Sequence, residues 1–172
     1  DDFQVTVQPG LGYKDLNIQL ARHGLFFAPD PGANASIGGM VANNAAGIRT
    51  VKYGATKDNV LRIQVVLADG RIVEAGSRSV KQSSGYDLAH LFIGSEGTLG
   101  LVTEATLKLA PIPEHISAAV AFFASVEDAI QAIVAVRGSG TEPAALEFLD
   151  GFTVGSISES IGLDMPAKPT IF

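Results

Sequence analysis

One stretch of the chain, residues 29–47, combines the residue types expected of a ligand-binding backbone. It contains four glycines, two prolines and three asparagines, with no lysine, arginine or glutamate. Small side chains let the backbone approach another molecule closely, and glycine adopts conformations that other residues avoid. Ser36 stands where a helix N-cap belongs, so the sequence predicts a short buried helix over residues 37–43. Free N–H groups at a helix start bind phosphate, so the stretch predicts a cradle for a large, partly anionic ligand; a tightly packed glycine turn is the alternative.

The sequence lacks the residues or motifs of several other kinds of functional site. There is no cysteine, which excludes disulfides, thiolate metal sites and flavin linked through cysteine. His23, His90 and His115 are scattered without metal-ligand spacing, so we expect no metal bound by this chain. The glycines at 94, 97 and 100 do not fit the dinucleotide fingerprint, and neither a P-loop nor a Gly-x-Ser-x-Gly elbow is present. No acid–base pair stands out, so the catalytic residues stay unassigned.

Four ordered groups of residues carry a resemblance to a known family. They are Asp30-Pro31 with Ser36-Ile37-Gly38-Gly39 and Asn43-Asn44-Ala45-Ala46-Gly47, then Tyr53-Gly54-Ala55-Thr56-Lys57-Asp58-Asn59-Val60, Gly85-Tyr86-Asp87-Leu88, and Gly94-Ser95-Glu96-Gly97-Thr98-Leu99-Gly100-Leu101-Val102-Thr103. Over about residues 5–109 the chain resembles FAD-linked oxidases of the vanillyl-alcohol oxidase type. The nearest branch holds D-lactate dehydrogenases, glycolate oxidase flavin subunits and D-2-hydroxyglutarate dehydrogenases. One glycine run alone would be a weak signal, whereas four ordered groups are specific.

The resemblance implies FAD as the cofactor and assigns residues to it. The implied binding residues are Pro29, Ser36, Ile37, Gly38, Gly39, Asn43, Gly47, Tyr53, Gly54, Glu96, Gly97 and Val102. Those up to Gly39 would line the pyrophosphate and the ring, those from Asn43 to Gly54 would lie near the isoalloxazine, and the last three would hold the adenosine end. A carboxylate at Glu96 suits ribose hydroxyls, although a surface turn carboxylate explains it equally well without the resemblance.

The same resemblance implies an activity. We expect a fragment of an FAD-dependent 2-hydroxy acid dehydrogenase or oxidase, which moves a hydride from a substrate of the D-lactate, glycolate or D-2-hydroxyglutarate type to flavin. Two alternatives stay open: another alcohol or sugar oxidase of this flavin fold, and a non-catalytic module or subunit of a heteromeric flavoprotein complex. The family's Pro-Gly-Gly-Gly-Thr or Gly-Gly-x-Thr pyrophosphate loop is absent, as are its cap-domain arginines and histidines. We therefore expect this chain alone to be inactive.

The composition limits the partners. With 172 residues, 47% of them apolar, the chain is long enough for one domain and part of another. A formal net charge of −6 without a clustered basic stripe argues against nucleic acid as a partner. No apolar run reaches membrane-spanning length. We expect a cytoplasmic protein, free or peripheral to a membrane, that forms a homodimer or serves as a subunit of an oxidase complex.

Hydrophobic periodicity predicts the elements that position the glycine-rich stretch. A helix is expected over residues 11–23, with Leu16, Leu20 and Ala21 facing inward and a glycine stop at position 24. Asp69-Gly70 is a hairpin turn signal. Four strands are expected, at residues 3–8, 59–67, 71–75 and 99–109.

Three features of this part have more than one interpretation. Arg49 and Lys52 lie close to the expected phosphate-binding stretch, but solvated loop charges explain them equally well. Tyr86-Asp87 is interpreted as a capping turn before Leu88 rather than as a chemical group. His23, in the last turn of its helix, is interpreted as structural.

Past the prolines at 111 and 113 the pattern changes to that of a second domain. Strands are expected at residues 116–123 and 144–149, and helices after Ser125 and over residues 152–161. The first of these helices has an apolar stripe at Val126, Ala129, Ile130, Ile133 and Val134. The expected fold class is α+β. Residues 1–110 would be the second lobe of an FAD-binding domain of the PCMH type, without its first lobe, and residues 111–172 the truncated start of an α+β substrate (cap) domain.

Overall fold

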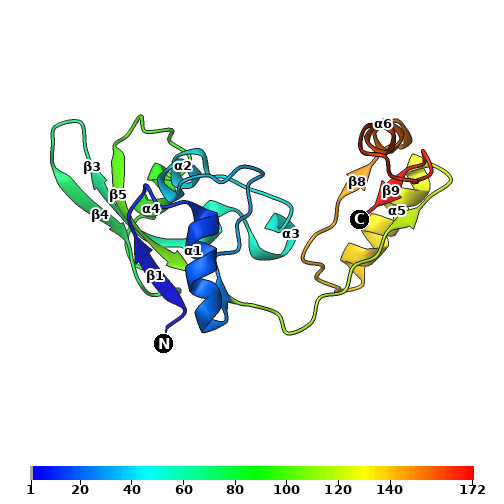
Figure 1. The fold of residues 1–172 in the computed structure, drawn as a ribbon. Helices are drawn as coiled ribbons and strands as arrows, with labels where there is room; N and C mark the ends of the chain where they lie inside the picture. Colours follow the sequence, from blue (N-terminus) through cyan, green and yellow to red (C-terminus); the bar gives the residue numbers. More distant parts are fainter. Residues whose placement is uncertain (1) are drawn as a thin grey trace. The chain divides into compact units, whose positions relative to one another are not determined.

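A computed structural model describes residues 2–172 of the chain. The chain divides into two compact units, Asp1–Pro113 and Glu114–Phe172. Both units mix helices and strands, as Figure 1 shows. No helix within the described residues combines the length and apolar character needed to cross a membrane.

The first unit is built on a four-stranded antiparallel sheet. Its strands are β1 (Gln4–Val7), β5 (Leu101–Lys108), β3 (Val60–Val66) and β4 (Ile72–Gly76), in that spatial order. All four expected strands are thereby confirmed. The expected turn is also present, because the Gly70 N–H donates to the Leu67 carbonyl at 2.9 Å between β3 and β4. Alternate residues of the strands face the core, among them Ile63 and Val65 on β3 and Ala105 and Leu107 on β5.

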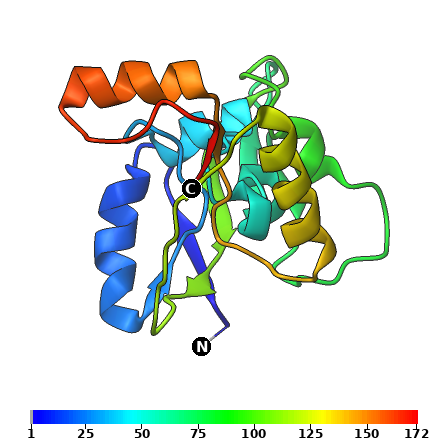
Figure 2. The same ribbon diagram turned by 90° about the vertical axis from the view of Figure 1, so that its right-hand side faces the viewer.

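One long helical segment covers part of this sheet. α1 (Tyr13–Leu20) continues as the 3-10 turn η1 (Ala21–His23), and β2 (Leu25–Phe26) then pairs with β6 (Ala110–Pro111). In both views α1 lies beside β1 (Figure 1, Figure 2). Leu16 and Leu20 are buried as expected, but Ala21 is exposed. The inward placement of Ala21 was wrong because the helix tightens into a 3-10 turn at that residue and changes its periodicity.

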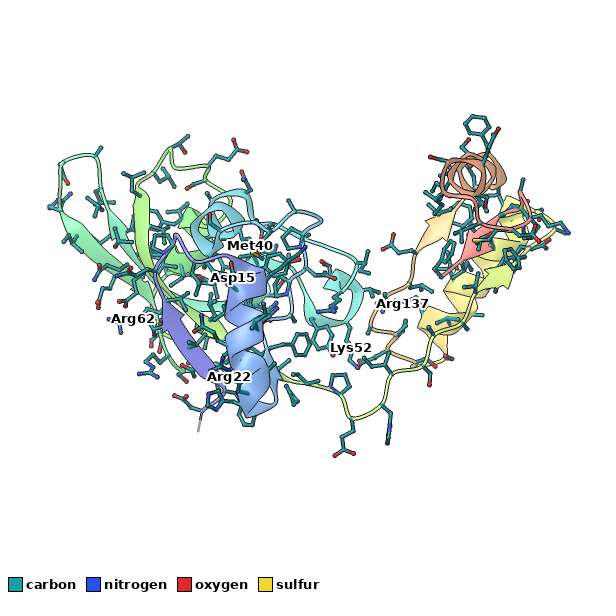
Figure 3. The ribbon with its side chains drawn as sticks, in the orientation of Figure 1. Asp15, Arg22, Met40, Lys52, Arg62 and Arg137 are labelled. Atoms are coloured by element: carbon teal, nitrogen blue, oxygen red, sulfur yellow. The ribbon has the colours of Figure 1, made fainter. Side chains whose placement is uncertain are left out.

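The glycine-rich stretch forms α2 (Ile37–Asn43), which packs against β5. Ser36 is its N-cap, so the predicted helix and cap are both confirmed. Met40, labelled in Figure 3, is fully buried in the core. Two short turns follow, α3 (Thr50–Tyr53) and η2 (Thr56–Asn59), and α4 (Leu88–Phe92) precedes β5. Of these short elements, η2 packs against α2, and α4 packs against β3 and β4.

The second unit has a small antiparallel sheet with two helices. Its strands are β7 (Ala121–Phe122), β9 (Thr170–Ile171) and β8 (Phe148–Leu149), with β9 in the centre. α5 (Val126–Gly138) follows its N-cap Ser125, as expected, and α6 (Gly151–Ile161) follows its N-cap Asp150 and begins one residue before the expected start. Each cap side chain accepts a hydrogen bond from the backbone three residues later, at 3.1 Å for Ser125.

Two expectations for the second unit were wrong in extent. The strands expected at residues 116–123 and 144–149 shrink to two residues each, because β9 offers each of them only two partners. The apolar stripe of α5 is also largely uncovered: Ala129 is buried, but Val126, Ile130 and Val134 are 44–60% exposed. A sheet this small cannot cover a thirteen-residue helix.

Candidate functional site

The start of α2 does not offer free backbone donors. The Ile37 N–H donates to the Leu11 carbonyl and the Gly38 N–H to the Pro9 carbonyl, both at 2.8 Å. The Gly39 N–H donates to the Ser36 hydroxyl at 3.2 Å. The expectation that free N–H groups here bind phosphate was therefore wrong. The loop before α1, which is remote in sequence, supplies the acceptors that a phosphate would otherwise provide.

The C-terminal end of α2 is the more open end. Here the Gly94 N–H donates to the Val41 carbonyl and the Glu96 N–H to the Ala42 carbonyl, both at 2.9 Å. These bonds dock the 94–97 turn against the last turn of α2. Three implied cofactor residues are exposed around this junction: Asn43, Glu96 and Gly97. The structure thus brings together side chains from two distant motifs of the sequence.

This junction also holds strained backbone. Three non-glycine residues among those described have positive φ: Phe3, Asn44 and Glu96. Two of them, Asn44 at 46° and Glu96 at 52°, lie where α2 meets the 94–97 turn. Left-handed backbone costs a non-glycine residue of the order of 1 kcal/mol, and such residues cluster at ligand-binding sites. Both residues help to set the course of the backbone where α2 meets the 94–97 turn.

Hydrogen bonds from side chains to backbone carbonyls fix Tyr53 and Gly54 beside the same end of α2. The buried Asn59 amide donates to the Tyr53 carbonyl at 2.8 Å and to the Ala55 carbonyl at 2.9 Å. The Thr56 hydroxyl donates to the Ala45 carbonyl, just past α2, at 2.7 Å. The turn at Tyr53-Gly54 is therefore tied to the end of α2.

Other implied residues are placed differently. Pro29 and Ile37 are each less than 2% exposed, so neither presents surface to a ligand in this structure. Val102 is half-buried on β5, opposite Val65, and packs against the core. Ser36, Gly38 and Gly39 lie toward the other end of α2, at a rise of about 10 Å from Asn43 for Ser36 and about 6–8 Å for the two glycines. A ligand that touches both ends must be extended.

His90 links α4 to η2 and forms an ion pair with Asp87. Asp87 is the N-cap of α4, which confirms the capping interpretation of that residue, and its carboxylate also contacts the His90 ring. His90 Nε2 faces the Lys57 carbonyl at 2.9 Å. The hydrogen bond to Asp87 raises the pKa of His90, and the same bond lowers the pKa of Asp87. Because both neighbours of the ring are acceptors, the geometry favours the imidazolium form.

A cavity of about 300 Å³ lies next to this ion pair. It is lined by the 79–87 loop together with Val60, Leu61 and His90. None of the implied cofactor residues lines it.

Sequence reasoning missed several residues that shape the site. Asn44 accepts from the Lys57 N–H at 2.9 Å while its own φ is positive. An Asn directly after a predicted helix is a usual left-handed cap, and this signal was present in the sequence. Asn59 and Asp30 had no such local signal, because their partners are set by the fold.

Comparisons with known proteins identify the family of the chain. Residues 1–76 match a family model described as an FAD binding domain, and residues 112–171 match the model of the C-terminal domain of FAD linked oxidases. The chain thus combines an FAD-binding domain with a segment that matches the C-terminal domain of FAD linked oxidases. It belongs to the FAD-linked oxidases, as the resemblance implied.

Similar proteins cover the whole chain. A mitochondrial D-lactate dehydrogenase [cytochrome] of Arabidopsis thaliana is 44% identical over 99% of this chain, and glycolate oxidase subunit GlcD of Bacillus subtilis is 41% identical over 99%. An alkyldihydroxyacetonephosphate synthase structure has a TM-score of 0.75 at 23% identity over 99% of the chain, which shows the fold. The chain spans 30%, 37% and 34% of these three proteins, respectively.

FAD, the cofactor of this family, fits one end of the site better than the other. The open end of α2 presents exposed polar side chains on strained backbone, as an extended dinucleotide would need. The start of α2 has no spare N–H among Ile37, Gly38 and Gly39 for a pyrophosphate. Gly38 serves instead to bring α2 close to the loop around Pro9.

Proposed function

We propose that the chain is part of an FAD-dependent oxidoreductase that oxidises a small 2-hydroxy acid to the 2-oxo acid. The observation that carries the proposal is the open, strained surface where α2 meets the 94–97 turn, in a chain of the FAD-linked oxidase family. When bound, the flavin would supply the acceptor for a hydride from the substrate α-carbon. The protein would supply shape, hydrogen bonds and the exclusion of water.

The roles of individual residues follow from their positions. The Glu96 carboxylate is exposed and suits the ribose hydroxyls of the adenosine end, and the Asn43 amide beside it can both donate and accept. Gly47, Tyr53 and Gly54 would form the wall nearest the ring. The start of α2 would contribute van der Waals contact rather than N–H donors to the phosphates.

The substrate class is proposed from the names of the relatives. Relatives at 41–45% identity are called D-lactate dehydrogenases and a glycolate oxidase subunit, and both names refer to small 2-hydroxy acids. A subunit role within an oxidase complex is proposed on the same basis. Several relatives are mitochondrial proteins, whereas others come from bacteria and an archaeon.

The proposal is tested first by cofactor binding. The 172-residue chain is titrated with FAD, and flavin absorbance is followed through gel filtration. We expect co-elution of flavin with protein, and we expect Glu96→Gln to weaken binding by about three- to tenfold through loss of a charge-assisted hydrogen bond. Glu104→Gln, on an exposed position of β5, is the matched control and should leave binding unchanged. Equal effects of the two substitutions would contradict the assigned site.

A further inference from the structure

Asp30 joins two parts of the site that are distant in sequence. Its side chain is only 15% exposed, and its Oδ1 accepts a hydrogen bond from the Arg49 N–H at 3.1 Å. Its Oδ2 lies 3.5 Å from Arg49 Nε. One carboxylate thus holds both the backbone and the side chain of Arg49. We refer to this pair as the Asp30–Arg49 clamp.

The clamp sets the position of Gly47. A Cβ added at Gly47 would lie 2.2 Å from the Asp30 carbonyl oxygen and 2.3 Å from its Oδ1. The Gly47 N–H donates to the Thr50 hydroxyl at 3.1 Å, which closes the turn toward α3. The turn at Gly47 therefore lies directly on Asp30, and no side chain fits between them.

The clamp also reaches Tyr53 through an aromatic contact. Arg49 Cζ lies 5.4 Å from the centroid of the Phe26 ring, and the Phe26 and Tyr53 centroids are 5.5 Å apart with an interplanar angle of 82°. This is an edge-to-face pair with a guanidinium over one of its rings. A displacement of Arg49 would therefore change the contacts that position both Gly47 and Tyr53.

Lys52, the other cation of this segment, is different. It is exposed, and among residues 2–172 no carboxylate lies within 4.0 Å of its ammonium group. Its Nζ lies 5.6 Å from the centroid of the Tyr53 ring (labelled Lys52 in Figure 3). The two cations, which the sequence could not distinguish, have separate roles in the structure.

We propose that Asp30 and Arg49 are positioning residues that hold the Gly47 turn and Tyr53 in the arrangement required by the flavin ring. The inference rests on the proposed function, because Gly47 and Tyr53 are placed beside the ring there. It assigns the contribution of Arg49 to its geometry and not to its charge. A lysine at position 49 keeps the charge but lacks the planar fork that holds Asp30 and stacks on Phe26.

The test compares matched variants of the 172-residue chain. Arg49→Lys keeps the cation, Asp30→Asn keeps the shape of the carboxylate, and Lys52→Ala removes the free cation. Asp69→Asn removes one partner of another Asp–Arg pair, in the β3–β4 turn, and controls for general loss of an ion pair. FAD affinity is measured by equilibrium dialysis, and the visible circular dichroism of bound flavin is recorded at saturation.

We expect Arg49→Lys and Asp30→Asn to weaken FAD binding by about tenfold and to change the circular dichroism of the bound flavin. Asp69→Asn should stay within about twofold of the parent chain, with an unchanged spectrum, and Lys52→Ala, which loses an exposed contact with the Tyr53 ring, should lose less affinity than Arg49→Lys. A loss in Lys52→Ala equal to that in Arg49→Lys would show that charge matters and would overturn the inference.

Two further outcomes separate the inference from the proposed function. Normal affinity and an unchanged flavin spectrum in both Arg49→Lys and Asp30→Asn would overturn the positioning role while leaving FAD binding intact. A parent chain that binds no FAD would overturn the cofactor site and the inference together. Asp30→Asn is nearly isosteric, so it keeps the test available if Arg49→Lys lowers the unfolding midpoint.

Discussion

The two adjacent glycines of α2 lead to opposite predictions, although the sequence motif treats them as equivalent. A Cβ added at Gly38 would lie 2.6 Å from Pro9 Cβ and 3.2 Å from the Pro9 carbonyl oxygen. At Gly39 the nearest atom would be the Ser36 hydroxyl oxygen, at 3.2 Å, which is the end of a rotatable side chain. Position 38 faces the rigid Pro9 ring, and its N–H donates to the Pro9 carbonyl, whereas position 39 faces neither.

The magnitudes decide the sign at each position. Replacing glycine by alanine inside a helix stabilises by about 0.5–1 kcal/mol. Forcing a methyl group into a packed contact costs about 1–3 kcal/mol. For Gly38→Ala the second effect wins, and we expect a net loss of about 1–2 kcal/mol, or about 4–8 °C in Tm. For Gly39→Ala we expect stability unchanged or raised by up to about 0.5 kcal/mol.

The assay is urea unfolding of the chain without FAD, followed by far-ultraviolet circular dichroism. Gly32→Ala is the control, because a Cβ at that loop position meets nothing within 4 Å. If Gly38→Ala is as stable as the parent chain in the absence of cofactor, packing against Pro9 does not explain this glycine. The reasoning that the start of α2 serves the fold rather than the phosphates would then be refuted.

The remaining predictions concern α4 and the second unit. Because the pKa of His90 is raised, its stabilisation of the folded chain is complete below the ordinary pKa of 6.5 and is lost as the pH rises through the raised value. The pKa of Asp87 is lowered, so its stabilisation of the folded chain is present above 3.8 and is lost as the pH falls through the lowered value. His90→Gln should therefore reduce the free energy of unfolding, measured by urea titration, more at pH 6 than at pH 9. The difference should be less than about 1 kcal/mol, because the pair is largely exposed. Equal losses at both pH values would contradict the ion pair. Ser125→Ala should cost about 1 kcal/mol by removing the cap of α5, seen as a lower Tm, whereas Ser125→Thr should retain most of it, because its hydroxyl can still accept from the backbone and donate to the Asp128 carboxylate. Ser158→Ala should be neutral or stabilise by up to about 1 kcal/mol in the same melt, because the Ser158 hydroxyl is buried with no partner among the described residues; a clear loss would mean that the hydroxyl is bonded in solution.

Local signals in the sequence were sufficient for most elements of the fold. The caps at Ser36 and Ser125, the turn at Gly70 and the alternation along β3 each depend on residues close together in the chain. Such signals fix where an element begins and which face it buries. The helix over residues 37–43 was predicted to the residue for this reason.

The site was less predictable because its contacts are non-local. The N–H groups of Ile37 and Gly38 are bonded by carbonyls 26 and 29 residues earlier, at Leu11 and Pro9. The sequence of α2 itself does not predict that the carbonyls of Leu11 and Pro9 accept these hydrogen bonds. The burial of Thr106, a polar residue of β5, has the same origin, because its hydroxyl bonds to that of Thr6 at 2.9 Å.

The pairing of β1 with β5 has a consequence for synthesis of the chain. Thr6 and Thr106 are 100 residues apart, so at about 5–20 residues per second the first strand waits about 5–20 s before its partner exists. Until then β3 has only β4 beside it, and the sheet has no closing strand on the other side. A product ending at residue 76, where the FAD-binding match stops, would lack β5 altogether. Such a product would leave strand edges open to other chains and to proteases, so the shortest fragment worth expressing on its own extends past Lys108.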